Sequence, residues 1–406
     1  MRKLIPILVI VIIYLIFSQL ITGNIFKLSY YPYYTFLLDS FSQGKLFISS
    51  YSHDLSLFEG KYYPYWGIGP TLFIYPFYLF GIKSDVFYTL IAGILNVFLF
   101  SLLLKEFLLN FKIKLSKFKE FFLVLCFAFI SPNFFLSLNG RIWHTEKVIS
   151  VLFLLLFLYF LFKYVNSNFK KFSYIFLSIL LFNIAWLSRL TFIFYGLMFV
   201  YLTLLIYKEK IVFKKFIITF SVLFLLGISI FATYNYARFR NSLETGLSYH
   251  IPAARYADAV FSKKLFSLNY IPHNLETYFL NPIKISLTDG KVYFDPEGNS
   301  ILSVYPFFLL LFFLFQIKHL KDKKKLYFLL VSALVLVFEF VLILLYFATG
   351  WVQFGSRYIA DIVPLALLMS AFAVESISSL FLLLILIYGI IINLFGTLFF
   401  YQKFPI

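Results

Sequence analysis

The sequence predicts an all-α polytopic membrane protein with about eleven transmembrane helices. Of its 406 residues, 62% are hydrophobic and only 13% are charged, whereas about a quarter of the residues are charged in a soluble globular protein. Apolar runs of roughly 20 residues recur along the chain and match the thickness of the bilayer's hydrocarbon core. These runs are continuous rather than alternating, which argues against a transmembrane β-barrel.

The apolar runs define the expected spans in order, beginning with a retained signal-anchor helix at residues 4–22. Later spans are expected at 84–104, 120–138, 147–164, 173–187, 190–207, 214–235, 301–317, 326–347, 358–374 and 378–399. The apolar segment 67–81 is short and contains Pro70 and Pro76, so we expect an interfacial or re-entrant segment there. The chain 1–406 is then a single membrane domain.

Lysine-rich loops predict the orientation of these spans. With eleven spans, the N-terminus and the loops 105–119, 163–171, 208–215 and 318–325 fall on one side, and they carry most of the lysines. The positive-inside rule places this side in the cytoplasm of a cell membrane. The net charge of +17 is thereby explained without a nucleic-acid partner, and the remaining polar segments face the extracytoplasmic side.

The first extracytoplasmic loop, residues 23–83, carries the aspartates that we consider candidate bases. Asp39 lies in YYTFLLDSF, whose apolar residues share one face at helical spacing, as in a helix on a membrane surface. Asp54 follows His53 and precedes a tyrosine-rich segment with Gly/Pro turns. An aspartate at such a position can also simply cap a helix or a turn.

Other polar side chains lie in shorter extracytoplasmic segments. The loop NGRIWHTEK contains Arg141, His144 and Glu146. His144 and Glu146 can form an acid–base pair, bind a divalent metal together, or belong to an interfacial polar cluster. The long segment 236–300 contributes Arg238 and Arg255, which can bind a phosphate or anionic lipid headgroups.

Two further charged positions lie in or beside the later spans. Arg357 and Asp361 are four residues apart, a spacing that allows an ion pair on a helix. Glu339 is a carboxylate inside the expected span 326–347. It is either functional or paired with a neighbouring helix. The only cysteine, Cys126, excludes an intramolecular disulfide, and neither a P-loop nor a His-Glu-x-x-His motif occurs.

Several of these segments resemble a known group of enzymes. HDLSLFEGKYYPYWGIGPTLFIYPF, YNYARFRNSLETGL, NLETYFLNP and QFGSRYIADIVP are similar to segments of bacterial membrane proteins in the glycosyltransferase family 39 (protein mannosyltransferase-like) group. The signal anchor, the long first loop and the number of spans resemble the wider GT-C superfamily of integral membrane glycosyltransferases. The chain differs from many members because His53–Asp54 and a distant Asp39 stand in place of adjacent acidic residues, which leaves metal use open.

The resemblance implies an inverting transfer of a sugar from a polyprenyl-phosphate donor to an unidentified glycan, lipid or protein acceptor in the cell envelope. It implies that Asp54 or Asp39 acts as general base, and we expect partial shielding from water to raise the pKa of that base. It also implies positive charge near the leaving phosphate, for which Arg238, Arg255 and Arg357 are candidates. The other substrate-binding candidates are His53, Arg141, His144 and Glu146. Two other functions stay open: a lipid-linked sugar flippase or transporter, and a non-catalytic membrane scaffold of the same fold.

Overall fold

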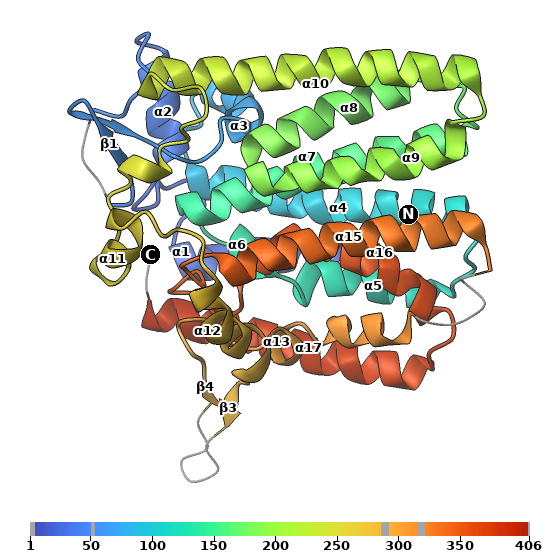
Figure 1. Cartoon of the computed structure of the whole chain (residues 1–406). Helices are drawn as coiled ribbons and strands as arrows, with labels where there is room; N and C mark the ends of the chain where they lie inside the picture. Colours follow the sequence, from blue (N-terminus) through green and yellow to red (C-terminus); the bar gives the residue numbers. More distant parts are fainter. Residues whose placement is uncertain (1–4, 50–52, 286–291, 315–320, 405–406) are drawn as a thin grey trace.

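Long apolar helices form the body of the protein in the computed structural model, which describes residues 5–49, 53–285, 292–314 and 321–404. Within these residues, 5 helices are long and apolar enough to cross a bilayer. They are α4 (Asp85–Phe111), α7 (Ile142–Asn166), α10 (Lys210–Phe239), α15 (Lys323–Leu345) and α17 (Ser379–Lys403). The chain is therefore a multi-pass helical membrane protein, and its helices run roughly side by side (Figure 1).

The other expected spans are shorter or interrupted, so the expected count of eleven is not confirmed. They correspond to α1 (Ile5–Thr22), α5 (Lys117–Phe129) with α6 (Pro132–Ser137), α8 (Phe172–Ser188), the 3₁₀ helix η1 (Leu190–Leu197) with α9 (Met198–Ile206), α13 (Ile301–Val304) with the 3₁₀ helix η6 (Pro306–Phe313), and the 3₁₀ helix η7 (Arg357–Asp361) with α16 (Val363–Val374). Proline accounts for several of these interruptions because it lacks a backbone N–H and cannot continue a preceding helix. Pro132 begins α6, Pro306 begins η6, and Pro364 is the second residue of α16. The last part of the expected span 301–317 lies outside the described residues.

The expected lysine-rich loops meet at one end of the bundle, which we call the lysine end. There Lys324 Nζ donates to the Asn110 carbonyl oxygen at 3.0 Å, and Lys119 Nζ donates to the Glu375 carbonyl oxygen at 3.0 Å. Phenylalanines pack edge to face just inside this end, where the ring centre of Phe107 lies 5.1 Å from that of Phe328 and 5.4 Å from that of Phe372. Arg2, Lys3 and Lys318 lie outside the described residues. The side of the membrane that this end faces stays a prediction.

Short elements cover the opposite end, which we call the site end (Figure 1). They are α2 (Tyr33–Phe41), the hairpin β1 (Ser56–Phe58) and β2 (Lys61–Tyr63), α3 (Pro70–Leu79), η2 (Leu247–Tyr249), η3 (Ala254–Tyr256), α11 (Ala257–Phe261), η4 (Leu268–Tyr270), α12 (Ile271–Leu275), the π-helical turn η5 (Glu276–Leu280) and the hairpin β3 (Lys284–Ile285) and β4 (Val292–Tyr293). The expected all-α fold thus carries two small antiparallel hairpins among the described residues. At 10 residues, α3 is too short to cross a bilayer.

The apolar face of α2 packs inside the protein, which corrects the expectation of a helix lying on the membrane surface. Tyr34, Leu37 and Leu38 are all at most 4% exposed and belong to the main hydrophobic core. The amphipathic pattern was therefore a sound indication of a helix with one buried face. The partner of that face is the chain itself rather than lipid.

A close backbone approach fixes the start of α7 against α4. A Cβ atom on Gly140 would lie 2.4 Å from the Val86 nitrogen and 2.5 Å from the Asp85 carbonyl carbon. Both are backbone atoms, which cannot move aside as a flexible side chain can. Only glycine therefore allows Arg141 and the first turn of α7 to sit where they do.

We predict that Gly140→Ala lowers the free energy of unfolding by about 1–3 kcal/mol through overpacking. Thermal unfolding in detergent measures this loss. Gly44→Ala is the matched control: it meets nothing within 4 Å, and only its φ of +70° opposes the change, at a cost of about 1 kcal/mol. A Gly140→Ala protein as stable as the wild type would contradict this packing.

Candidate functional site

Asp54 lies at the centre of the site end, in a backbone conformation that is uncommon for its residue type. Its φ of 69° lies in the left-handed region, which aspartate tolerates better than most residues. A segment that is distant in the sequence pairs with the residues that follow Asp54. Ile251 N donates to the Leu55 carbonyl oxygen at 2.8 Å, and Ser56 forms an isolated antiparallel β-bridge with His250. This pairing brings His250 beside Asp54.

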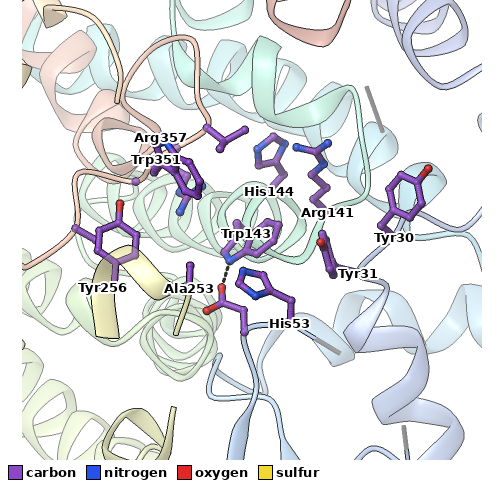
Figure 2. A pocket seen from close by; sticks show the side chains of 14 residues that line it. Tyr30, Tyr31, His53, Arg141, Trp143, His144, Ala253, Tyr256, Trp351 and Arg357 are labelled. Atoms are coloured by element: carbon purple, nitrogen blue, oxygen red, sulfur yellow. Dashed lines mark hydrogen bonds between the residues drawn. The ribbon is translucent and has the colours of Figure 1, made fainter. Parts of the chain in front are cut away.

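Side chains from three separate segments contact the Asp54 carboxylate. The His250 Nε2 atom hydrogen-bonds Oδ1, Trp143 Nε1 donates to Oδ2 at 2.6 Å, and the Tyr65 hydroxyl donates to Oδ2 at 3.4 Å. Figure 2 shows the Trp143 bond at the edge of a cavity. Since each carboxylate oxygen has two lone pairs, Oδ1 can still accept a further proton donor.

The environment of Asp54 lowers its pKa, so the expected rise is wrong. Burial alone would raise the pKa, but the hydrogen bond and charge of His250 and the hydrogen bond from Trp143 outweigh it. Burial dominates instead for the neighbouring Tyr65, whose pKa is raised well above its ordinary value. Asp54 is therefore an ionised acceptor at neutral pH.

A cavity of about 490 Å³ that is lined by charged, histidine and aromatic side chains opens beside Asp54. Its lining residues are Tyr30, Tyr31, His53, Asp54, Arg141, Trp143, His144, Ala253, Tyr256, Ala348, Gly350, Trp351, Val352 and Arg357 (Figure 2). Aromatic rings pack closely within this wall, with Tyr31 and Trp143 at a centroid distance of 5.0 Å and Trp143 and His53 at 6.3 Å. We call this space the polar cavity.

A second cavity, also of about 490 Å³, adjoins Asp54 and has a mainly apolar wall. Leu190, Ile193, Phe194, Leu342, Ile343 and Phe347 are among its lining residues. Leu190 and Ile193 are also 43% and 42% exposed on the outer surface of the apolar helices. We call this space the apolar cavity.

The two cavities share part of their lining. Asp54, Trp143, Tyr256, Ala348 and Arg357 line both. An ionised carboxylate and a guanidinium group thus lie where a cavity lined by histidine, arginine and aromatic side chains meets one with a more apolar wall. A molecule with an apolar tail and a polar head matches such a pair of compartments.

Buried ion pairs hold the floor of the apolar cavity together. Arg189 Nε lies 2.5 Å from Asp361 Oδ2, and Arg189 Nη1 lies 3.2 Å from Glu146 Oε1. Lys147 Nζ lies 3.5 Å from the other Asp361 oxygen, at a position where both side chains are at most 2% exposed. We call Glu146, Lys147, Arg189 and Asp361 the buried ion cluster.

Asp361 does not pair with Arg357, although their spacing allows it on an α-helix. The segment between them is the 3₁₀ helix η7, in which residues four apart do not share a face. In residues 5–49, 53–285, 292–314 and 321–404, no carboxylate forms an ion pair with Arg357. Its guanidinium lies over the rings of Trp143 and Tyr358, at 5.9 and 5.5 Å.

The structure brings together some of the residues expected in the site. His53, Asp54, Arg141, His144 and Arg357 line the polar cavity. Glu146 lines the apolar cavity and pairs with Arg189. His144 and Glu146 therefore point to different partners, since His144 Nδ1 lies 3.5 Å from the Tyr401 hydroxyl.

Three expected site residues lie outside both linings. Asp39 accepts hydrogen bonds from Lys83 and Tyr78 at 2.6 Å, on a surface where its side chain is 36% exposed. Arg238 donates to the Pro64 carbonyl oxygen at 2.7 Å and stacks on Tyr234. Arg255 pairs with Glu297 and lies over Trp351. These contacts secure the loops around the cavities.

Sequence reasoning did not assign a role to several residues that make up the site. His250, Trp143 and Tyr65 contact Asp54, and Lys147 and Arg189 belong to the buried ion cluster. The sequence offered only a weak signal for them, namely polar or aromatic residues in segments on one expected side of the membrane. Among the described residues, no three His, Cys, Asp or Glu side chains are arranged to hold a metal ion.

Comparison with models of protein families, with curated protein sequences and with solved structures gives no match.

We predict that Asp361→Asn lowers the free energy of unfolding by about 3 kcal/mol, because it leaves Arg189 and Lys147 buried without their shared partner. Chemical unfolding in mixed micelles measures the loss. The exposed ion pair Lys83–Asp39 provides the control, since Lys83→Met should cost less than about 1 kcal/mol. Equal effects of the two substitutions would show that the cluster does not stabilise the bundle.

Proposed function

We propose that this protein is a membrane glycosyltransferase that moves a sugar from a polyprenyl-phosphate donor to an acceptor hydroxyl, with inversion. The observation that carries the proposal is the shared wall of the two cavities, where Asp54 and Arg357 both lie. The resemblance in sequence supports the same chemistry. With the lysine end in the cytoplasm, this wall faces the extracytoplasmic side.

Asp54 is the general base in this proposal. The acceptor hydroxyl gives its proton to the carboxylate while its oxygen forms a bond to the anomeric carbon, and the bond from that carbon to the phosphate oxygen breaks. The lowered pKa of Asp54 keeps the carboxylate ready to accept, and the bonds from His250 and Trp143 hold it in one orientation. General-base catalysis of this kind contributes about 10²–10⁴-fold to a rate.

Arg357 stabilises the leaving lipid phosphate, which departs with the bonding electron pair. A guanidinium group suits this role because it stays charged and can bind two phosphate oxygens at once. Arg357 is free of a carboxylate partner among the described residues. The first units of the polyprenyl chain then occupy the apolar cavity, whose wall near Leu190 and Ile193 reaches the surface that faces lipid.

A lipid-linked sugar transporter is the second candidate, favoured by the buried ion cluster and by Glu339. Charged groups inside apolar helices often mark a transport path. The carboxyl group of Glu339 is fully buried and interacts electrostatically with Asp361, Arg189 and Lys147. Reconstituted vesicles separate the two functions, because a transporter moves labelled lipid-linked sugar across the bilayer while no new glycosidic bond forms.

We predict that Asp54→Asn lowers the turnover number for sugar transfer by at least about 100-fold, because an amide cannot accept the hydroxyl proton. The measurement uses purified protein and a panel of polyprenyl-phosphate sugars, with folding checked by thermal unfolding. Asp39→Asn is the matched control and should leave the turnover number within about twofold, because Asp39 lies outside both cavities. Full activity of Asp54→Asn would remove the proposed base.

We predict a pH profile in which Asp54 remains a competent base down to about pH 4, since its pKa lies below the ordinary value. The carboxylate is lost only as the pH falls through that lowered pKa. In His250→Ala the main lowering influences are gone and burial dominates, so the pKa of Asp54 rises and the acidic fall in kcat/KM moves to higher pH. An acidic limb at the same pH in both proteins would contradict this role of His250.

A further inference from the structure

Residues 261–268, which follow α11 at the site end, expose several large apolar side chains (Figure 1). Phe261, Phe266 and Leu268 are each more than half exposed. We call residues 261–268 the rim segment. Single exposed apolar side chains are ordinary on a protein surface, but several of them within one short loop mark a surface that binds a partner or a membrane.

Two lysines lie between the exposed phenylalanines of the rim segment. Lys263 and Lys264 are both exposed, and the nearest carboxylate along the chain belongs to Asp258. Across the part of the chain that the structure describes, neither lysine forms an ion pair with a carboxylate. Positive charge interleaved with exposed apolar side chains is typical of a segment that lies on an anionic membrane surface.

Backbone hydrogen bonds fix the rim segment against the end of α15. Ser267 N donates to the Leu345 carbonyl oxygen at 2.9 Å, and Phe347 N donates to the Leu265 carbonyl oxygen at 3.1 Å. Since α15 is long and apolar enough to cross a bilayer, its end marks the boundary of the hydrocarbon core. The rim segment therefore lies at the level where this helix leaves the bilayer.

The exposed face of α15 leads directly to the rim segment. Leu334, Val337 and Val341 are 51%, 55% and 44% exposed, and their spacing of three and four residues places them on one face of the helix. Leu345, whose carbonyl oxygen bonds to the rim segment, follows Val341 by one turn on the same face. The exposed apolar face of a membrane-spanning helix contacts lipid tails, so the rim segment is held beside lipid.

The rim segment also forms part of the edge of the apolar cavity. Phe266 lines this cavity although more than half of the residue is exposed, and its ring centre lies 5.4 Å from that of Tyr346, another lining residue. A residue that both lines a cavity and is exposed marks the place where the cavity opens. The opening, the lipid-facing helix α15 and the two lysines therefore lie together.

From these observations we infer that the rim segment docks on the lipid leaflet at the site end and recognises the headgroups of anionic phospholipids. Phe261 and Leu268 enter the region of the acyl chains, while Lys263 and Lys264 bind the headgroup phosphates. Docking keeps the opening of the apolar cavity inside the leaflet, so that a lipid tail reaches the cavity without crossing water. The inference goes beyond the proposed function, because it requires neither sugar transfer nor transport.

Nitroxide spin labels test the docking in the full-length protein. Ser262→Cys places a label within the rim segment, and Glu59→Cys places a control label on the exposed turn between β1 and β2 at the same end. The buried native thiol is removed by Cys126→Ala. Collisions of each label with O2, which concentrates in the bilayer, are compared with collisions with a water-soluble nickel chelate in phosphatidylglycerol nanodiscs. We expect O2 to dominate at the Ser262→Cys label and the nickel chelate at the Glu59→Cys label.

The apolar contribution is measured with the label in the rim segment. Phe261→Ser combined with Leu268→Ser should move this label into water and make it accessible to the nickel chelate. Leu243→Ser is the matched control, because Leu243 is an exposed leucine outside the rim segment, and it should leave the accessibility of the label unchanged. Thermal unfolding confirms that each variant is folded.

The lysines account for the expected lipid preference. Lys263→Gln combined with Lys264→Gln should lower the ratio of docked to undocked label by about 30-fold in phosphatidylglycerol nanodiscs, since each lysine near an anionic surface favours binding about fivefold. In phosphatidylcholine nanodiscs, the same variant and the wild type should dock equally. Lys61→Gln, at an exposed lysine in β2, is the control and should keep the preference for phosphatidylglycerol.

Each part of the inference has a result that would overturn it. Equal access of the nickel chelate to the labels at Ser262→Cys and Glu59→Cys would show that the rim segment stays in water. Poor access of both O2 and the nickel chelate at Ser262→Cys would show that protein, rather than lipid, covers the segment. Equal docking of the wild type in phosphatidylglycerol and phosphatidylcholine nanodiscs would remove the recognition of anionic headgroups.

Discussion

The contact between Arg189 and Asp361 is the interaction on which the rest of the site depends. It joins the end of α8 to η7 across 172 residues of sequence, at 2.5 Å, inside the helical body. Because Glu146 and Lys147 complete the pairing from α7, three segments of the bundle are fixed to one another. Removing one partner from such a cluster leaves a buried charge without compensation, which is strongly destabilising. The packed helices therefore require all four charged side chains of the cluster.

That constraint has a direct effect on the chemistry above it. Asp361 is held by Arg189 and Lys147 and is therefore unavailable to Arg357, which lies at the other end of the same short 3₁₀ helix. Arg357 stacks over Trp143 and Tyr358 and lines both cavities. Trp143 in turn donates to Asp54, so the proposed base and the proposed phosphate ligand are positioned through one shared ring.

Hydropathy and periodicity predicted the elements of the fold better than their partners. The five full-length helices coincide with expected spans, because apolar length is a local property of the chain. The sequence also predicted that α2 has one apolar face. It did not predict that protein, rather than lipid, covers this face.

Among the site residues, Asp54, Arg141 and Arg357 were singled out from the sequence as polar groups on one expected side of the membrane. The contacts that define the site were not predictable, since Asp54 meets His250 across 196 residues and Trp143 across 89. The predicted direction of the Asp54 pKa shift was wrong because the sequence indicated burial but not the hydrogen bonds that outweigh it.

The proposed function requires a lipid phosphate to bind at the wall between the two cavities. A structure determined by electron cryo-microscopy with a non-transferable polyprenyl-phosphonate sugar tests it most directly. We expect the phosphonate within hydrogen-bond distance of Arg357, the lipid chain leading into the apolar cavity past Ile193 and Phe347, and the sugar facing Asp54. A phosphonate bound away from Arg357, or a lipid chain seated outside the apolar cavity, would contradict it.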